Sequence, residues 1–506
     1  MQLFRTKSVE QTLAETGDSK RKLVRNLNAW DLAVMGVAVA VGAGIFSVGA
    51  QAAAYHAGPA VILSFIIAGV VCGAAVMCYA EFASMIPVAG SAYTFTYTTI
   101  GEFVAWIIGW DLILEMLMAG AVIAKYWGVY LNDLFHLMGI NFNTVFHFGF
   151  FTFDIAPLII VTFFTVLLVL GTRLSARVDG ALTVLKIAIV AFVVIVGFFY
   201  VKASNYTPFI PPAQPAGSVP GAAASGIMGQ PLWQWATGLQ PSIYGVGGIL
   251  SGAALVFFAF IGFDVVATAS EETKDPHKNV PRGIGLGMVL VTVLYILVAI
   301  VTTGMVSYKD LAKAASPSLA TGFELVGATW AAKIISFGIV IGLTTVVMVL
   351  LLGLTRVVFA MSRDGLLPQQ LSKVGKHGTP ARLQIVLGVI VALVASCFDV
   401  GVLSDMVNIG TLSAFTLVAI SVPIMRRKRP ELPRAFRMPG NPWVPILIAL
   451  ANLWLMLNLS VLTWIRFVVW LLVGFAVYFG YSYRHSRLGN EELAADISDE
   501  TKASIG

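Results

Sequence analysis

The chain has 506 residues, of which 58% are hydrophobic and only 11% are charged. Soluble domains carry about 25% charged residues, so this composition excludes an ordinary soluble protein and indicates an all-α polytopic membrane protein. The formal net charge of +6 does not indicate nucleic-acid binding, because the Lys and Arg residues lie in short loops between apolar runs. Three Cys and six His are scattered along the chain, and this spacing predicts no metal site and no cofactor.

A polar, basic segment at residues 1–29 begins the chain and predicts a cytoplasmic tail without a cleavable signal peptide. Twelve apolar runs follow, each long enough to predict a transmembrane helix. They lie near residues 30–55, 59–86, 102–131, 155–172, 179–201, 246–270, 283–307, 326–361, 382–398, 404–425, 443–461 and 464–483. An even number of spans places both termini on the same side.

The distribution of Lys and Arg predicts the orientation. With the N-terminus inside, the predicted cytoplasmic segments hold 24 of these residues and the opposite side holds 5. The positive-inside rule therefore predicts that both termini are cytoplasmic. We expect a multi-pass protein of the plasma membrane, which is the cell inner membrane if the source is bacterial.

The first apolar run carries two glycines at its midpoint, in the segment Val41-Gly42-Ala43-Gly44-Ile45. Each glycine costs a helix roughly 1 kcal/mol relative to alanine, so the pair favours local unwinding. Unwound backbone within a bilayer is tolerated only where protein or water covers it, and its free N–H groups can bind a carboxylate. The alternative is that the glycines only let neighbouring helices approach closely.

The sixth run repeats this anomaly, since Phe257 to Asp264 sets Ala259 and Gly262 among aromatic residues and ends on an acidic one. Interrupted runs at positions one and six predict two inverted repeats of five helices. The predicted organisation is a tail at 1–29, a first repeat at 30–201, an external loop at 202–245, a second repeat at 246–425, helices 11 and 12 at 426–483, and a cytoplasmic tail at 484–506.

An ionisable residue within a predicted span needs a partner or a cavity. Glu115 lies about thirteen residues into span three, roughly 20 Å along the helix and near the middle of the bilayer, so it is a candidate proton carrier. Lys186 lies about eight residues into span five. Its stem extends toward the surface, or its amine is buried and either loses its charge through desolvation or keeps it beside carbonyls at a broken helix end. Glu81 is predicted to be an interface or gate contact, and Asp111 to pair locally.

Several motifs occur together and in a fixed order. They are Gly42 to Phe46, Tyr79 to Tyr93, Gly109 to Glu115, Phe257 to Asp264 with Glu271 to Pro276 and Val280 to Ile284, Arg356 to Gly365, and Arg434 to Gly440. This set resembles the amino acid–polyamine–organocation superfamily of permeases, most closely the cationic amino acid transporter family and its bacterial homologues. The resemblance covers about residues 22–480. It implies a LeuT-type fold with discontinuous helices 1 and 6, which works by alternating access.

The resemblance also implies roles for individual residues. The substrate carboxylate would meet N–H groups around Val41, Gly42, Ala43, Gly44 and Ile45. The other implied residues are Phe257 and Ala259 for the α-amino group, Phe260 as an aromatic lid, Gly262 as room for the second break, Lys186 in place of a sodium ion, and Glu115. We therefore expect coupling to protons rather than to sodium.

The substrate stays open at this point. The Gly-Ala-Gly motif lacks the Ser or Thr that many relatives carry, and Thr344 in span eight predicts a small pocket for neutral or modestly polar L-amino acids, while Arg and Lys remain alternatives. An obligate exchanger of amino acids or polyamines is the main rival to a proton symporter. A channel, a transporter-like sensor and an enzyme are the remote alternatives, because the sequence shows no charged pore rings, no appended signalling domain and no paired catalytic motif. Oligomeric state is not predicted.

Overall fold

A computed structural model of the chain describes residues 5–6, 27–85, 91–140, 143–148, 151–171, 176–215, 226–240, 242–262, 266, 273–314, 316–375, 379–431, 434 and 436–489. These residues are helical almost throughout, which confirms the predicted all-α class. Two short antiparallel pairs are the exceptions, β1 (Val145–Phe148) with β2 (Phe151–Asp154), and β3 (Gln214–Pro215) with β4 (Ser242–Ile243). The predicted tails and Asp264 lie largely or wholly outside the described residues.

The helices of the first half, in chain order, are α2 (Ala29–Ala40), η1 (Gly44–Val48), α3 (Gly49–Ala52), η2 (Ala53–Ala57), η3 (Gly58–Ala60), α4 (Val61–Met85), α5 (Ser91–Thr99), α6 (Glu102–Leu137), α7 (Ile155–Val169), α8 (Ala176–Phe198), η4 (Ala203–Tyr206), η5 (Ile227–Gly229) and α9 (Leu232–Thr237). Segments η1 and η2 are π-helical, and η3, η4 and η5 are 3₁₀ turns.

The helices of the second half are α10 (Gly245–Val256), η6 (Phe257–Phe260), α12 (Pro276–Met305), α13 (Tyr308–Leu311), α14 (Leu319–Leu325), α15 (Thr329–Arg363), η8 (Gln369–Ser372), α16 (Ala381–Cys397), α17 (Val400–Lys428), α18 (Trp443–Leu457), α19 (Val461–Val477), η9 (Tyr478–Ser482) and α20 (Tyr483–His485).

Within the described ranges, seven helical segments are long and apolar enough to cross a membrane. They are Gly44–Met85, Glu102–Leu137, Ala181–Phe198, Lys278–Met305, Thr329–Arg363, Val400–Lys428 and Val461–His485. Five shorter apolar helices accompany them: Ala29–Ala40, Ile155–Val169, Gly245–Phe260, Ala381–Cys397 and Trp443–Leu457. The chain is therefore a multi-pass membrane protein.

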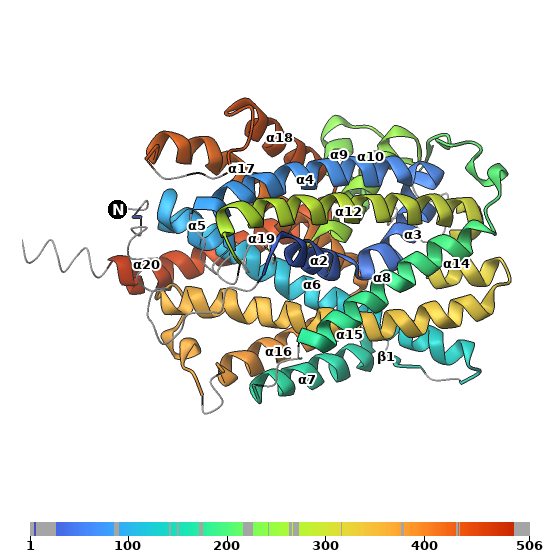
Figure 1. Ribbon diagram of the computed structural model, residues 1–506, viewed down its shortest axis with the longest axis horizontal. Helices are drawn as coiled ribbons and strands as arrows, with labels where there is room; N and C mark the ends of the chain where they lie inside the picture. The colour runs from blue at the N-terminus through green and yellow to red at the C-terminus, as the bar shows by residue number, and fades with distance from the viewer. Residues whose placement is uncertain are drawn as a thin grey trace, which may run out of the picture.

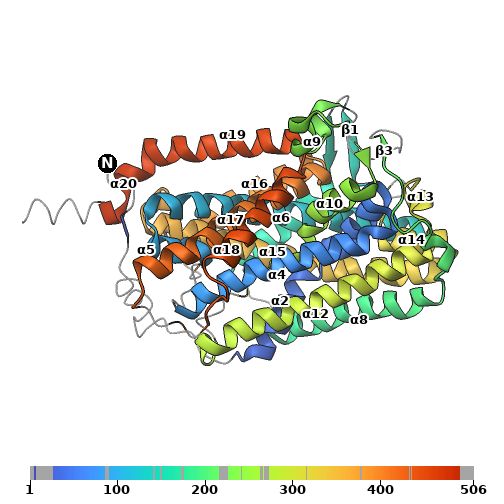
Figure 2. The same cartoon turned by 90° about the horizontal axis from the view of Figure 1, so that it is seen from above.

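The long helices run roughly side by side along the longest axis of the molecule, as Figures 1 and 2 show. Helix α6 lies at the centre, where it packs against α15 and α17, and it is the most buried of the long apolar helices. We call the end of the bundle that holds α5 and α20 the terminal end. The opposite end, which holds β1 and α13, is the hairpin end (Figure 2). A central helix with polar residues is thus covered by apolar neighbours along its length.

The start of α2 is set by local chemistry. The Asn28 side chain accepts hydrogen bonds from the N–H groups of Trp30 and Asp31, at 2.8 and 3.1 Å, and the Asp31 carboxylate accepts one from the Asn28 N–H at 2.9 Å. This reciprocal capping box satisfies donors that a helix leaves unpaired at its beginning. The helix therefore begins at Ala29, one residue before the predicted start of the first span.

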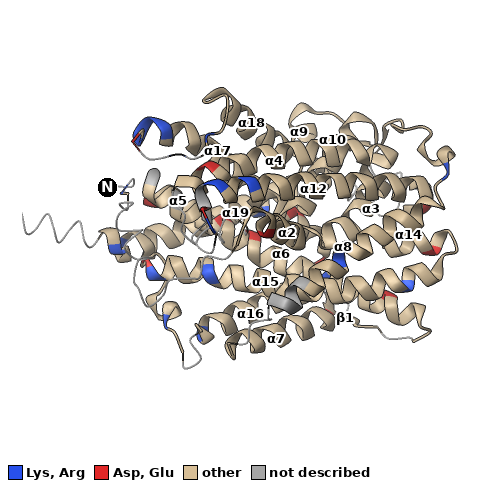
Figure 3. Ribbon diagram, viewed as in Figure 1, with Lys and Arg blue, Asp and Glu red and all other residues tan. Residues whose placement is uncertain are grey.

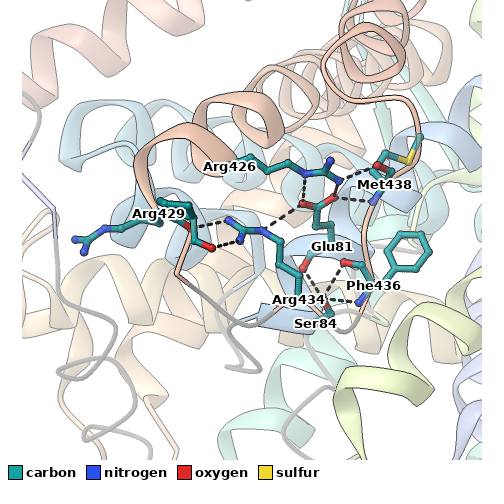
Figure 4. A network of polar contacts seen from close by, with 8 residues as sticks. Glu81, Ser84, Arg426, Arg429, Arg434, Phe436 and Met438 are labelled. Atoms are coloured by element: carbon teal, nitrogen blue, oxygen red, sulfur yellow. Dashed lines mark hydrogen bonds and ion pairs between the residues drawn. The ribbon is translucent and has the colours of Figure 1, made fainter.

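Lys and Arg gather toward the terminal end of the bundle (Figure 3). One cluster there is organised around Glu81 in the last turn of α4, whose side chain is 1% exposed. Arg426 of α17 donates from Nε and Nη2 to the two carboxylate oxygens, at 2.8 and 2.6 Å. The Met438 N–H donates to Oε2 at 2.7 Å, and Arg434 Nε lies 3.7 Å from Oε1 (Figure 4). Glu81 is thus an interface residue that joins α4 to α17 and to the segment after it.

We predict that Glu81→Gln destabilises the folded chain by about 3 kcal/mol, because it leaves the Arg426 guanidinium near the interior without its counter-charge. The measurement is the midpoint of thermal unfolding in detergent, read by size-exclusion chromatography after heating. The control is Asp310→Asn, which removes the exposed pair of Asp310 with Lys313 at 2.8 Å. An exposed pair contributes about 1 kcal/mol or less. Equal midpoints for the two variants would contradict the stabilising role of the Glu81 pair.

Candidate functional site

The first break lies where the two glycines interrupt the apolar run. Helix α2 ends at Ala40, Val41 takes φ −71° and ψ 87°, and the π-helical segment η1 begins at Gly44. The first N–H groups of any helical segment have no carbonyl partner within that segment. The break therefore presents backbone donors in the middle of the protein, and every residue from Val41 to Ile45 is buried there.

The second break follows the short 3₁₀ turn η6. Its next residue, Ile261, is extended with φ −71° and ψ 144°, and Gly262 takes φ +110°. That backbone conformation favours glycine, and a Cβ at this position would lie only 2.4 Å from Cγ1 of Val39. Gly262 is therefore required both by its own conformation and by the close approach of α2. Phe257 and Ala259 lie within η6, and both are buried.

The two breaks touch each other through their backbones. A Cβ added to Gly44 would lie 2.3 Å from Cα of Ala259 and 3.0 Å from its nitrogen. Only a glycine permits this separation, since the opposing atoms belong to the main chain and cannot rotate away. The structure thus brings together five residues of the first apolar run and three of the sixth, which lie more than 200 positions apart in the chain.

Tyr295 of α12 connects the two breaks, and the sequence analysis did not identify it. Its hydroxyl lies 2.6 Å from the carbonyl oxygen of Ala40 and 2.7 Å from that of Ala259. One hydroxyl hydrogen is thus shared between the last carbonyl of α2 and a carbonyl of η6. The side chain is fully buried. The only available signal was a polar aromatic residue inside an apolar run, which is common in membrane helices.

Lys186 of α8 reaches the first broken helix. Its Nζ donates to the carbonyl oxygen of Ala38 at 2.9 Å, and the residue is only 4% exposed. Its stem packs on Gly342 of α15, where an added Cβ would lie 3.0 Å from Cγ of the lysine. The stem therefore does not extend to the surface, and the amine lies at a carbonyl near the end of the broken helix, where the helix dipole favours a cation.

Glu115 lies deeper in α6, on the terminal side of the break. Ile123 marks the level of the break along α6, because a Cβ added to Gly42 would lie 3.7 Å from Cδ1 of Ile123. Glu115 is eight residues before Ile123, or about 12 Å along the helix. It is 1% exposed. Lys186, on α8, reaches α2 at Ala38, whereas Glu115 belongs to α6.

Two further predicted residues, Thr344 and Phe260, contact neighbouring helices. The hydroxyl of Thr344 in α15 donates to the Val340 carbonyl at 2.7 Å and accepts from Nε1 of Trp127 in α6 at 3.2 Å. The ring of Phe260 packs between α4 and α12, with centroid distances of 6.4 Å to Phe65 and 5.1 Å to Tyr295. In this conformation Phe260 therefore contacts α4 and α12, and Thr344 joins α15 to the central helix.

The hairpin-end half of the first broken helix is tied to its neighbours by hydrogen bonds. Tyr130 of α6 donates to the carbonyl oxygen of Phe46 at 2.6 Å, and Tyr244 donates to that of Ala54 at 2.7 Å. At the terminal end, the N–H of Lys274 donates to the Leu27 carbonyl oxygen at 2.8 Å. The segments on both sides of the first break are therefore hydrogen-bonded to neighbouring parts of the chain.

A buried backbone site between two interrupted helices, within a multi-pass helical bundle, defines a membrane permease. The family profile described as "Amino acid permease" matches residues 27–487. The chain belongs to this family, which lies within the amino acid–polyamine–organocation superfamily, as the sequence motifs predicted.

Curated relatives match along most of the chain. It is 42% identical to the branched-chain amino acid permease BcaP of Bacillus subtilis, over 96% of this chain and 99% of that protein. It is 40% identical to the methylthioribose transporter of the same organism, with the same coverage. It is 34% identical to the vacuolar cationic amino acid transporter 4 of Arabidopsis thaliana, over 85% of this chain and 68% of that protein. The relatives are transporters, and their names give three different substrates.

Proposed function

We propose that the chain is a secondary active transporter that takes up L-amino acids with protons by alternating access. The observation that carries the proposal is the backbone contact of the two breaks at Gly44 and Ala259, with the amine of Lys186 bound to Ala38 of the same broken helix. Freed N–H groups suit a carboxylate and freed carbonyl oxygens suit an α-amino group. The Lys186 amine at the end of the broken helix would stand in for a cation, and this supports coupling to protons rather than to sodium.

The architecture that we propose is twelve transmembrane helices, built as two inverted repeats of five at 30–201 and 246–425 with helices 11 and 12 at 426–483. The seven long and five shorter apolar helices are compatible with this arrangement. The basic residues at the terminal end support a cytoplasmic location for both termini at the plasma membrane. In that orientation Glu115 lies on the cytoplasmic side of the substrate and is the proposed proton carrier.

For the substrate we propose neutral L-amino acids with small or branched apolar side chains. Ile45 belongs to the break, Ile123 lies against Gly42, and the Thr344 hydroxyl is already engaged by Trp127 of the central helix. A cationic side chain would need an acidic partner at this level, and Glu115 lies about 12 Å away along α6. The name of the 42% identical permease supports the same choice.

The test is uptake of a panel of radiolabelled leucine, alanine and arginine into proteoliposomes, with an inward proton gradient and no sodium. We expect leucine to accumulate, and we expect this accumulation to collapse when the gradient is dissipated. In Glu115→Gln the accumulation is lost while counterflow exchange persists, because the variant can carry substrate but not the proton. Asp310→Asn, which neutralises an exposed carboxylate, serves as the matched control and behaves like the wild type.

Two results would contradict the proposal. Uptake that requires an internal amino acid, whatever the proton gradient, would establish the rival function of an obligate exchanger. Accumulation that survives unchanged in Glu115→Gln would remove this residue from the coupling mechanism.

A further inference from the structure

Asp111 is a second acidic residue on the central helix, and the function proposed above does not use it. It lies nine residues after Glu102, or about 14 Å from the terminal end of α6. It is 0% exposed. Asp111 precedes Glu115 by four residues, and this spacing places both side chains on one face of the helix.

The Asp111 carboxyl group has a single hydrogen-bond partner in the described part of the chain. Oγ of Ser413 in α17 lies 2.8 Å from Oδ2, and Oδ1 is buried without any donor. The expected local pairing is not found among the described residues: the partner is a hydroxyl 302 positions away on α17, and no counter-charge accompanies it. An ionised carboxylate in this place would carry its full charge in an apolar interior.

Two other buried carboxylates near the terminal end have more hydrogen-bond donors. Glu81 has two guanidinium groups and a backbone N–H. Glu102 accepts hydrogen bonds from the hydroxyls of Tyr97 and Tyr478, each at 3.1 Å, and from Ser486. Each of these two groups therefore accepts from at least three donors. Asp111 accepts from one hydroxyl.

The charged and titratable groups on the helices around α6 do not compensate Asp111. Helices α5, α7, α15, α16, α17 and α19 all pack against α6. Their groups of this kind are Tyr93 and Tyr97 on α5, none on α7, Lys333, Arg356 and Arg363 on α15, Arg382 and Cys397 on α16, Asp405, Arg426, Arg427 and Lys428 on α17, and Arg466 on α19. Among the described residues none forms an ion pair or hydrogen bond with Asp111. On α17, Arg426 is thirteen residues from Ser413, or about 20 Å along the helix.

We propose that Asp111 is a proton-binding site, which holds a proton in this conformation and releases it when α17 moves away from α6. A protonated Oδ2 donates to Oγ of Ser413 across the same 2.8 Å and leaves Oδ1 as a neutral carbonyl oxygen. Release returns the proton to water that reaches the carboxyl group only after the helices separate. The release step rests on the proposed proton-coupled uptake, whereas the protonation itself does not.

The first arm of the test is infrared spectroscopy of the full chain in lipid nanodiscs at neutral pH. We expect the carbonyl stretch of a protonated carboxyl group in the wild type, and its loss in Asp111→Asn. Ser413→Ala keeps the acid and removes its partner, so the band stays but shifts in frequency; this variant reports on Asp111 even if Asp111→Asn does not fold. Asp310→Asn leaves the band unchanged. A band that neither variant alters would overturn the proposal.

The second arm measures transport in proteoliposomes. In Asp111→Asn, gradient-driven accumulation of leucine falls at least tenfold while counterflow exchange is retained. Unchanged accumulation would overturn the release step. If the wild type shows no gradient-driven accumulation, the proposed function fails, and the infrared result still decides whether Asp111 holds a proton.

Discussion

Gly44→Ala reduces the initial rate of leucine uptake by about a hundredfold or more. The added methyl group would lie 2.3 Å from Cα of Ala259, and the atoms that it meets are main-chain atoms of the second break. A close-packed interior absorbs an extra methyl group only by moving the backbone, which costs about 1–3 kcal/mol or more. At this place the displacement also separates the two sets of backbone groups that we assign to the substrate. A loss of about 3 kcal/mol corresponds to about a hundredfold.

The measurements are initial uptake of leucine in proteoliposomes and the size-exclusion profile of the purified variant. The control is Gly285→Ala in α12, which makes the same change at a position where the new Cβ meets nothing within 4 Å. Gly262→Ala provides a second test of the same contact region, since it combines φ +110° with a Cβ that would lie 2.4 Å from Val39. Normal uptake by Gly44→Ala would show that the two breaks do not act as one site.

Tyr295→Phe lowers the transport rate by about tenfold to a hundredfold without preventing folding. The substitution removes only the hydroxyl that lies between the carbonyl oxygens of Ala40 and Ala259. An unsatisfied buried polar group costs about 1–3 kcal/mol, and this cost falls on the conformation in which both breaks are held together. The ring keeps its contacts, with centroids 5.7 Å from Phe65 and 5.1 Å from Phe260.

The matched control for this prediction is Tyr206→Phe. Tyr206 also places its hydroxyl on α12, 2.7 Å from the carbonyl oxygen of Ile300, but this hydrogen bond is exposed and bonds neither Ala40 nor Ala259. We expect near-normal uptake from it. Counterflow exchange separates a slowed cycle from lost binding, because saturating substrate restores binding but not the rate. Indistinguishable rates for the two Tyr→Phe variants would remove Tyr295 from the mechanism.

The family and the places of the two breaks could be predicted from the sequence because their causes are local. Glycine weakens a helix wherever it stands, so the pair at Gly42 and Gly44 marks the end of α2 without reference to any other segment. Gly262 acts in the same way at the second break, because it is a glycine within the aromatic run that begins at Phe257. Lys186 was identified as a candidate because a lysine within an apolar run has few stable environments.

Other predictions depended on contacts and came out only in part. For Lys186 the sequence allows a stem that extends to the surface or a buried amine. The 2.9 Å hydrogen bond to Ala38 shows that the amine lies at the broken helix. The partner of Glu81 lies 345 positions further along the chain at Arg426, and no spacing in the sequence indicates that pairing. Tyr295 was missed because a tyrosine in a membrane helix has many ordinary uses.

The sequence by itself thus determined the class of protein, the number of apolar runs and the positions where two of them break. These follow from composition and backbone preference, which act over a few neighbouring residues. Only the tertiary structure decided that Gly44 meets Ala259, that Tyr295 bridges the two breaks and that Asp111 has one hydroxyl for a partner. Those facts depend on which helices pack together and at what depth, and burial turns an ordinary hydroxyl or carboxyl group into a functional one by removing every alternative partner.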